Sequence, residues 1–276
     1  MLRIENLSFS YGKQKIYENF NLHVPRNQVC LVTGINGVGK STLLRLIAGV
    51  LKPASGKIIF DEKLGPDHRK KMGFISDRPS LYEDITVDSG IRLHKSVYGI
   101  SEFDDTLIRH TKIQGNQKIK NLSIGQRTIF HLSLILSAKP EILLVDEIIH
   151  AIDAYLRRIY LQQLTRLVAQ RKLTMIMVNL NFHDIENVVD RVILLKDAEI
   201  AVDEKIDSLK NKVKKIVGQK PPENLPILSH LDFPGNDSNE YFIYPYREEY
   251  RHQVDGNLVD LNLTEIVSAF IGGEYA

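Results

Sequence analysis

The sequence has 276 residues, of which 43% are hydrophobic and 25% are charged, and this composition is ordinary for a globular protein with a sizeable core. The formal net charge of +2 gives no reason to expect binding to nucleic acid or to an anionic membrane surface. The apolar runs, such as residues 142–145 and 192–195, are of strand length, whereas a membrane span needs roughly 20 residues. Arg3 and Glu5 interrupt the opening residues, which therefore do not resemble a signal peptide. We expect a cytoplasmic protein with no nucleic acid among its partners.

The first third of the chain predicts an antiparallel β layer, then a buried strand and a helix. Apolar and polar residues alternate in short bursts between residues 2 and 24, which is the period of strands with one buried face. The next apolar run contains the single cysteine, Cys30, which we expect to be a small buried core residue. The predicted elements that follow are a strand over 28–33, a helix over 43–48, and strands over 58–60 and 72–75.

The middle of the chain changes to a helical period, and strands and helices then alternate. Apolar residues recur at helical spacing from about 80 to 138, which predicts a helical insert. The alternation after it indicates a parallel sheet covered on both faces. Its predicted elements are a strand over 141–146, a helix over 153–170, a strand over 173–178, a helix over 182–188 and a strand over 191–195.

The composition changes beyond residue 205, first to Lys-rich and then to Pro, Asn and Asp. We interpret the Lys-rich stretch 205–215 as a solvated helix face. The prediction is therefore an α/β fold with a main domain over 1–205 and a small C-terminal extension over 206–276.

The stretch from Gly34 to Thr42 matches the phosphate-binding pattern G-x-x-x-x-G-K-[ST] between a predicted strand and a predicted helix. Its glycines let the backbone curl so that N–H groups point at phosphate oxygens, and the helix adds the positive end of its dipole. Lys40 would reach the β- and γ-phosphates, and the Ser41 hydroxyl would ligate Mg²⁺. The sequence therefore predicts a nucleoside triphosphate site formed by Gly34, Ile35, Asn36, Gly37, Val38, Gly39, Lys40, Ser41 and Thr42.

Two carboxylates, Asp146 and Glu147, follow the apolar strand 141–146. The carboxyl ends of parallel strands border the crevice where ligands bind in such sheets. Asp146 is placed to hold Mg²⁺, and Glu147 to orient or deprotonate the water that attacks the γ-phosphate. Tyr11 ends a predicted N-terminal strand, where its ring could pack across strands or form a platform on which a base stacks.

Residues 121–127, with the sequence Asn-Leu-Ser-Ile-Gly-Gln-Arg, predict on their own only the capped start of a helix. Between a phosphate loop and an Asp-Glu strand end, they resemble the signature motif of the ATP-binding cassette (ABC) family. Residues 72–82 are similar to the Q-loop region of that family, and residues 151–153 to its D-loop. The resemblance covers about 1–205 and implies the ABC-type P-loop fold, with a mixed sheet, an antiparallel layer and a helical insert.

The resemblance also implies a head-to-tail dimer with a second ABC ATPase subunit, identical or different. Each ATP would lie between the phosphate loop of one subunit and Ser123, Gly125 and Gln126 of the other, and Tyr11 would stack on adenine. Such ATPases usually drive a separate integral membrane permease by dimer closure, through the Q-loop and the helical insert. The implied location is therefore cytoplasmic and peripheral, on the inner face of the cell membrane.

Four positions depart from the family pattern, two of them Ile148 and Ile149 in place of the usual Pro-Thr after Glu147. Asp77 stands where the family usually has Gln, and its carboxylate would still bind Mg²⁺. Leu180 occupies the position of the switch histidine, and leucine cannot hydrogen-bond the γ-phosphate or the attacking water. His183 follows three residues later. In a helix, its imidazole would lie about 5 Å from the position of the switch histidine. We therefore expect slow hydrolysis, or a dimer whose other subunit carries the more competent residues.

The acid at position 77 and the run 261–270, which resembles the tail helix of exporter-type ABC ATPases, favour export over import. Two alternatives remain at this stage, a soluble ABC ATPase in a non-transport assembly and a subunit that senses ATP with weak hydrolysis. The sequence contains neither a second cassette nor a long coiled-coil insert, features that are typical of the first alternative. Nothing in the sequence indicates the transported substrate.

Overall fold

The computed structural model describes residues 1–76, 79–146, 154–169, 173–178, 185–218, 221–222, 224–231, 239–254 and 257–272. By packing, the chain forms two compact units, the first from Met1–Cys30 and Gly39–Asn179, the second from Leu31–Val38 and Leu180–Ala276. The domain boundary that we expect at residue 205 stays a prediction. Within the described ranges, no helix combines the length and the apolar character that a membrane crossing requires.

An antiparallel layer opens the first unit, as predicted. Its strand order is β2-β1-β4, with the strands β1 (Leu2–Tyr11), β2 (Gln14–Val24) and β4 (Ser55–Phe60). Leu2 pairs with Val24 on one side and with Phe60 on the other. The alternating apolar residues of β1 are buried, because one face of the layer packs on the core.

The main sheet contains six strands in the order β5-β6-β7-β3-β8-β9. These are β5 (Met72–Ile75), β6 (Ile142–Asp146), β7 (Thr174–Val178), β3 (Val29–Gly34), β8 (Arg191–Lys196) and β9 (Glu199–Lys205). The pairs β5–β6 and β6–β7 are parallel, and β8–β9 is antiparallel. Every residue of β3, β6 and β7 is buried, as expected of strands covered on both faces. The mixed sheet confirms the predicted fold class.

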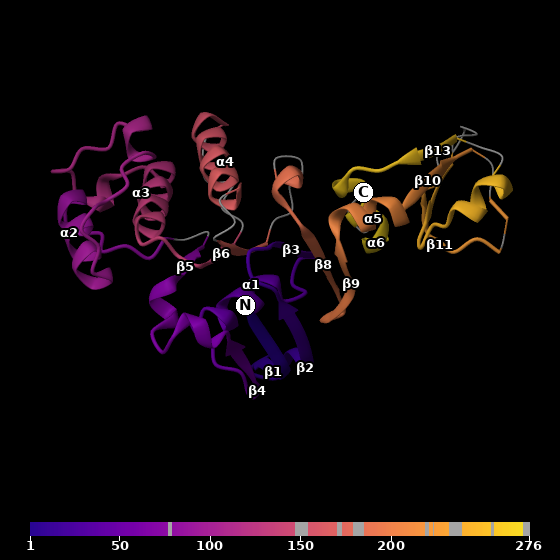
Figure 1. Cartoon of the computed structure of the whole chain (residues 1–276), viewed down its shortest axis with the longest axis horizontal. Coiled ribbons are helices and arrows are strands. Elements are labelled where there is room, and N and C mark those ends of the chain that lie inside the picture. Colours follow the sequence, from indigo (N-terminus) through magenta and orange to yellow (C-terminus); the bar gives the residue numbers. More distant parts are fainter. Residues whose placement is uncertain are drawn as a thin grey trace. The chain divides into compact units, whose positions relative to one another are not determined.

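Helix α1 (Lys40–Ile47) follows β3 and packs on β6 and β7. Figure 1 shows it between the antiparallel layer and β6. Its apolar side chains, among them Leu43, Leu44 and Leu46, are almost completely buried. The N-terminus of α1 is thereby held beside the carboxyl end of β6, where Asp146 lies.

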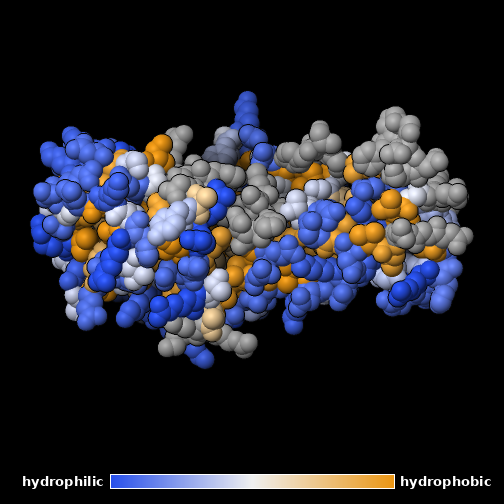
Figure 2. Space-filling model, turned by 90° about the horizontal axis from the view of Figure 1, so that it is seen from above, coloured by the Kyte–Doolittle hydropathy of each residue, from blue (hydrophilic) through white to orange (hydrophobic). Residues whose placement is uncertain are grey.

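The predicted helical insert is present and contains α2 (Val87–Tyr98) and α3 (Ile124–Ser137). Its small core consists of Val87, Ile119, Leu122, Phe130 and Leu134. Helix α4 (Ala154–Ala169) follows β6 in the chain. Figure 2 shows mostly hydrophilic residues over the insert, at the left, with smaller groups of hydrophobic residues between them.

A small C-terminal module belongs to the second unit and confirms the predicted appendage. Its antiparallel sheet has the order β11-β12-β10-β13, with β10 (Lys214–Val217), β11 (Ile227–Leu231), β12 (Glu240–Ile243) and β13 (Asn257–Asp260). Helix α5 (Ile206–Lys212) precedes the sheet, and α6 (Leu263–Ile271) packs on β11. The module core contains Ile216, Leu225, Tyr241, Ile243 and Tyr246.

One local prediction was wrong. The Lys-rich stretch is not one solvated helix face, because Lys214 and Lys215 lie in β10 with only 13% of each side chain exposed. Strand β10 is central in its sheet, so its lysines pair with Asp260, Glu240 and Glu265 around it. The helix expected over 182–188 begins outside the described residues and stays a prediction, while its described end contains a short 3₁₀ helix, Glu186–Val188.

Candidate functional site

No side chain caps the N-terminus of α1. Its N-cap, Gly39, makes no side-chain hydrogen bond, and the first turn contains no acidic residue. By contrast, Thr86, Ser123 and Asn262 cap α2, α3 and α6 with their side chains. An uncapped helix start presents backbone N–H donors and the positive end of the helix dipole. This end of α1 can therefore receive an anion such as a phosphate group.

Glycine is required at two positions of the loop that leads into α1. Gly34 has a φ of +138°, and a Cβ on it would lie 2.2 Å from the backbone oxygen of Leu195 in β8. Gly39 has a φ of +113°, and its Cβ would lie 2.7 Å from the hydroxyl oxygen of Tyr17. Any other residue would clash and strain the backbone at both positions. The loop conformation therefore depends on packing as well as on chain flexibility.

Lys40, Ser41 and Asp146 meet where α1 begins and β6 ends. Lys40 and Asp146 are 7% and 3% exposed, an unusual degree of burial for ionisable residues. The Ser41 hydroxyl donates a hydrogen bond of 2.8 Å to Oδ1 of Asp146. Hydroxyl and carboxylate oxygens are ligands that Mg²⁺ accepts, so this pair fits the metal that accompanies a nucleoside triphosphate. The structure thus brings together Ser41 and Asp146, which are 105 positions apart in the sequence.

Tyr17 contacts the phosphate loop, although no motif in the sequence predicts this contact. Its ring is 2% exposed in β2, and its hydroxyl donates a hydrogen bond of 2.9 Å to the carbonyl oxygen of Gly39. Burial raises the pKa of the Tyr17 phenol well above its ordinary value, so the hydroxyl remains a donor at all physiological pH values. Tyr17 directly follows the buried Ile16, so no alternating pattern marked it as buried. The pairing with Gly39 depends on tertiary packing.

Tyr17→Phe should lower the free energy of unfolding by about 1 kcal/mol and weaken ATP binding by less than about tenfold. The effect is moderate because the carbonyl oxygen of Gly39 keeps its bond from the Leu43 N–H. Thermal unfolding and nucleotide titration would measure both quantities. Tyr160→Phe is a matched control, because the Tyr160 hydroxyl is buried without a partner and its removal should not weaken ATP binding. Equal losses in both variants would contradict a specific role of Tyr17.

Ser123 is the N-cap of α3 and forms a capping box with Gln126. Its hydroxyl accepts a hydrogen bond from the Gln126 N–H at 3.2 Å, and the Ser123 N–H donates to Oε1 of Gln126 at 3.0 Å. The hydroxyl proton of Ser123 is not used in this arrangement, so it is available to an acceptor from another molecule. Ile124, the next residue, is 70% exposed. The signature segment therefore faces outward from its own subunit.

Arg127 holds the signature segment in place. Its guanidinium pairs with Glu83 at 2.7 Å and donates a hydrogen bond of 2.8 Å to the carbonyl oxygen of Lys120. These contacts join the start of α3 to the two chain segments beside it. No local pattern predicts this role of Arg127, since its partners lie 44 and 7 residues away.

Tyr11 ends β1 and is 44% exposed, with its ring edge-to-face against Phe9 at a centroid distance of 4.9 Å. It thus packs on a residue of its own strand and keeps part of its ring accessible. Several expected functional residues lie outside the described residues, so their geometry is not assigned. These are Asp77, Glu147, the segment 151–153, Leu180 and His183.

An uncapped helix start after a glycine-rich loop, beside an aspartate at a parallel strand end, defines a nucleotide-binding P-loop protein. A family model described as "ABC transporter" matches residues 17–150. The energy-coupling factor transporter ATP-binding protein EcfA1 of Oenococcus oeni is 32% identical, over 92% of this chain and 94% of its own length. The chain belongs to the family of ABC transporter ATP-binding proteins, and it is an ATPase of this type.

Further comparisons agree with this assignment. The lantibiotic transport ATP-binding protein SrtF of Streptococcus pyogenes is 26% identical, over 76% of this chain and 93% of its own length. Relatives named for import also match. Among solved structures, a dimeric post-hydrolysis state of the ATP-binding cassette MJ0796 bound to ADP and Pi has a TM-score of 0.64 and 23% identity. The match covers 75% of this chain and 99% of that one. That similarity shows the fold.

Proposed function

We propose that this chain is the nucleotide-binding subunit of a transporter and powers a separate integral membrane permease by ATP-driven dimer closure. The observation that carries the proposal is the uncapped start of α1 beside the Ser41–Asp146 pair, in a chain of the ABC family. Gly34, Ile35, Asn36, Gly37, Val38, Gly39, Lys40, Ser41 and Thr42 bind the phosphates in this proposal, and Tyr11 stacks on adenine. The exposed part of the Tyr11 ring supports that role.

Mg²⁺, when bound, neutralises charge on the β- and γ-phosphates. Ser41 and Asp146 are the described residues that would hold it, and Asp77 is the third candidate. Lys40 binds the β- and γ-phosphate oxygens and carries positive charge where negative charge develops during hydrolysis. Glu147 follows Asp146 directly in the chain, which supports its role in orienting or deprotonating the attacking water.

A second ABC ATPase subunit completes each site in this proposal. The exposed capping box of α3 supports this role, since Ser123 has a free hydroxyl proton and Gly125 lies in the first turn of the helix. Ser123, Gly125 and Gln126 would receive the γ-phosphate that is bound to the partner subunit. ATP then bridges both subunits, and hydrolysis removes the bridge. Whether the two subunits are identical is left to experiment.

The helical insert is the proposed contact with the permease, which places the chain peripherally on the inner face of the membrane. Exposed apolar side chains at the insert, Tyr82, Leu93 and Val97, support a protein contact there. The acid at position 77 and helix α6 favour export. Some matched relatives are named as import proteins. A transport assay would therefore test the proposed direction of transport.

Isolation of the tagged chain from detergent-solubilised membranes tests the proposal. We expect an integral membrane protein with several spans to co-purify in defined stoichiometry. Reconstitution of the two in vesicles should raise ATP turnover above that of the chain alone. A chain that purifies without a membrane protein, or only with a soluble assembly, would contradict the transport function and leave the ATPase assignment intact.

Leu180→His should raise the ATP turnover of the isolated chain severalfold, because an imidazole could hydrogen-bond the γ-phosphate or the attacking water. Turnover is measured by phosphate release at saturating ATP. Leu180→Gln is the control, because it introduces a polar side chain that has no titratable ring. A fast wild-type rate that the histidine leaves unchanged would refute the expectation of slow hydrolysis.

A further inference from the structure

The first turn of α3 has hydrogen-bond donors that its own helix does not use. An α-helix leaves the N–H groups of its first turn without partners inside the helix. The Ser123 hydroxyl oxygen accepts from the N–H of Gln126, so the N–H groups of Ile124 and Gly125 are left for a ligand, together with the hydroxyl proton. Ile124 is 70% exposed, so burial does not hold the outer side of this turn. Because hydrogen bonds weaken steeply with angle, a ligand binds well here only if other contacts fix the turn.

Arg127 fixes this turn from within the subunit. Its backbone N–H donates to the carbonyl oxygen of Ser123 at 2.8 Å, which closes the first helical turn. Its guanidinium donates to Oε1 of Glu83 at 2.7 Å and to the carbonyl oxygen of Lys120 at 2.8 Å. The third guanidinium nitrogen, Nε, is buried and has no hydrogen-bond partner in the described part of the chain. The two contacts at the far end of the side chain therefore set its orientation.

The two partners of this guanidinium are tied to each other. The Lys120 N–H donates to the carbonyl oxygen of Glu83 at 2.9 Å, and the Ile119 N–H donates to that of Ile85 at 3.0 Å. Residues 83–85 therefore form a strap that lies beside the segment leading into α3.

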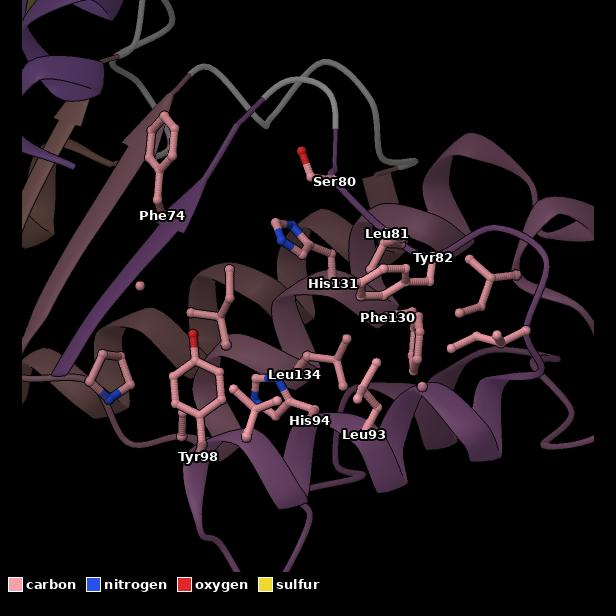
Figure 3. A pocket seen from close by; sticks show the side chains of 18 of the residues that line it. Phe74, Ser80, Leu81, Tyr82, Leu93, His94, Tyr98, Phe130, His131 and Leu134 are labelled. Carbon is pink, nitrogen blue, oxygen red and sulfur yellow. The ribbon is translucent and has the colours of Figure 1, made fainter. Parts of the chain in front are cut away.

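The strap is also anchored in the core of the insert. Leu81 and Ile85, on the two sides of Glu83, pack against the core cluster that contains Phe130. Figure 3 shows Leu81 close to Phe130 of α3, and both line a pocket between β5 and the insert. Phe130 is fully buried and follows Arg127 by three residues. Glu83 therefore lies on a segment that packing holds on both sides, and such a fixed carboxylate can orient a guanidinium.

A contribution to stability explains this ion pair poorly. The side chains of Arg127 and Glu83 are 29% and 55% exposed. Ion pairs that are so open to water stabilise proteins little, because water screens the charges. Orientation is a better explanation, since the planar guanidinium makes two contacts at once in fixed directions, which a lysine ammonium group does not reproduce. The geometry thus favours a role in positioning the turn.

We propose that Arg127 and Glu83 are positioning residues for ATP hydrolysis. They hold the Ser123 hydroxyl and the first-turn N–H groups in the geometry that receives the γ-phosphate of the partner subunit's ATP. The inference rests on the proposed function, which assigns that phosphate to the start of α3. Neither side chain touches ATP. Dimer closure and turnover therefore depend on the pair, whereas ATP binding at Lys40 of the same subunit does not.

The first test compares ATP binding with dimer formation in the full chain. Arg127→Ala should leave the ATP affinity of the single subunit unchanged and lower turnover by about 10- to 100-fold, as expected when a binding group is displaced. Combined with Glu147→Gln, it should abolish the dimer that ATP induces in Glu147→Gln alone. Arg109→Ala is the control, because Arg109 lies in the same insert and pairs with Asp105 at 2.8 Å, not with the strap.

Two results of this test would overturn the proposal. One is a folded Arg127→Ala with the wild-type turnover and a normal ATP-induced dimer. The other is a loss of ATP affinity in the single subunit as large as the loss of turnover, because the pair would then act on the subunit's own phosphate site.

The second test asks whether Arg127 acts through Glu83. Glu83→Ala should reproduce the losses, and the double variant should be no worse than either single variant. Glu83→Gln keeps an acceptor oxygen and should retain part of the turnover, and Arg127→Lys, which keeps the charge without both contacts, should not restore full turnover. Additive losses in the double variant overturn the proposal. If Arg127→Ala does not fold, the two Glu83 variants test the same pair.

Amide hydrogen exchange measures how firmly the turn is held. In the nucleotide-free chain, the peptide of residues 122–127 should exchange faster in Arg127→Ala than in the wild type, and the start of α6, capped by Asn262, should not change. Unchanged exchange over 122–127 overturns the positioning role and leaves the proposed function standing. If exchange rises as expected but ATP induces no dimer in Glu147→Gln, the proposed function is contradicted instead, and with it the γ-phosphate as the ligand of this turn.

Discussion

Replacing Lys40 by alanine should weaken ATP binding by about 10- to 150-fold, which corresponds to the roughly 1.5–3 kcal/mol of a hydrogen bond to a charged group. Lys40 is 7% exposed at the first residue of α1, so its ammonium group acts where water screens charge poorly. Turnover should fall further, because the negative charge on the phosphate oxygens grows during hydrolysis. Titration with a fluorescent ATP analogue measures the affinity, and phosphate release measures the turnover.

Lys112→Ala is the control for this substitution, since Lys112 is exposed in the helical insert and is not part of the site. It should leave affinity and turnover unchanged. Thermal unfolding of both variants checks that the fold is intact. Unchanged ATP affinity in a folded Lys40→Ala would refute the assignment of the whole phosphate site.

Glu147→Gln should lower ATP hydrolysis by about 10²- to 10⁴-fold, the usual contribution of a general base, while ATP binding remains. The amide keeps the shape of the side chain and cannot take a proton from water. Because ATP then persists between the two subunits, a closed dimer should accumulate. Size-exclusion chromatography with light scattering, with and without ATP, measures that dimer.

Glu141→Gln is the matched control at the other end of the same strand. Glu141 pairs with Lys71 at 2.9 Å and with Arg26 at 3.5 Å, and it is 35% exposed. Its replacement should reduce stability by at most about 1 kcal/mol and leave turnover unchanged. If Glu147→Gln binds ATP and forms no dimer, the proposed closure is contradicted. If it also hydrolyses ATP at the wild-type rate, Glu147 is not the general base.

The phosphate loop and the core strands could be predicted from sequence because their physical causes are local. Gly34 to Thr42 is a continuous stretch whose glycines and Lys-Ser pair suit a phosphate, whatever surrounds them. Strand β6 is a short apolar run ending in a carboxylate, and a strand covered on both faces has that pattern. The start of α3 was equally readable, because Ser123 caps it as predicted, and the structure adds the reciprocal bond of a capping box with Gln126.

Other features depend on contacts between distant residues. The sequence marks Lys214 and Lys215 as charged, yet their burial follows from the place of β10 between β12 and β13. The pairing of Tyr17 with Gly39 joins residues 22 positions apart, and no local pattern indicates it.

The sequence by itself determined the class of protein, and it predicts the phosphate-binding residues and the carboxylates after the apolar run 141–146, because each depends on a short run of residues and its period. Only the tertiary structure decided which of these residues meet and what else surrounds them. It pairs Ser41 with Asp146, sets Tyr17 against the loop, and joins Arg127 to Glu83. The reason is that burial and hydrogen-bond partners are properties of packed surfaces, which no single stretch of the chain contains.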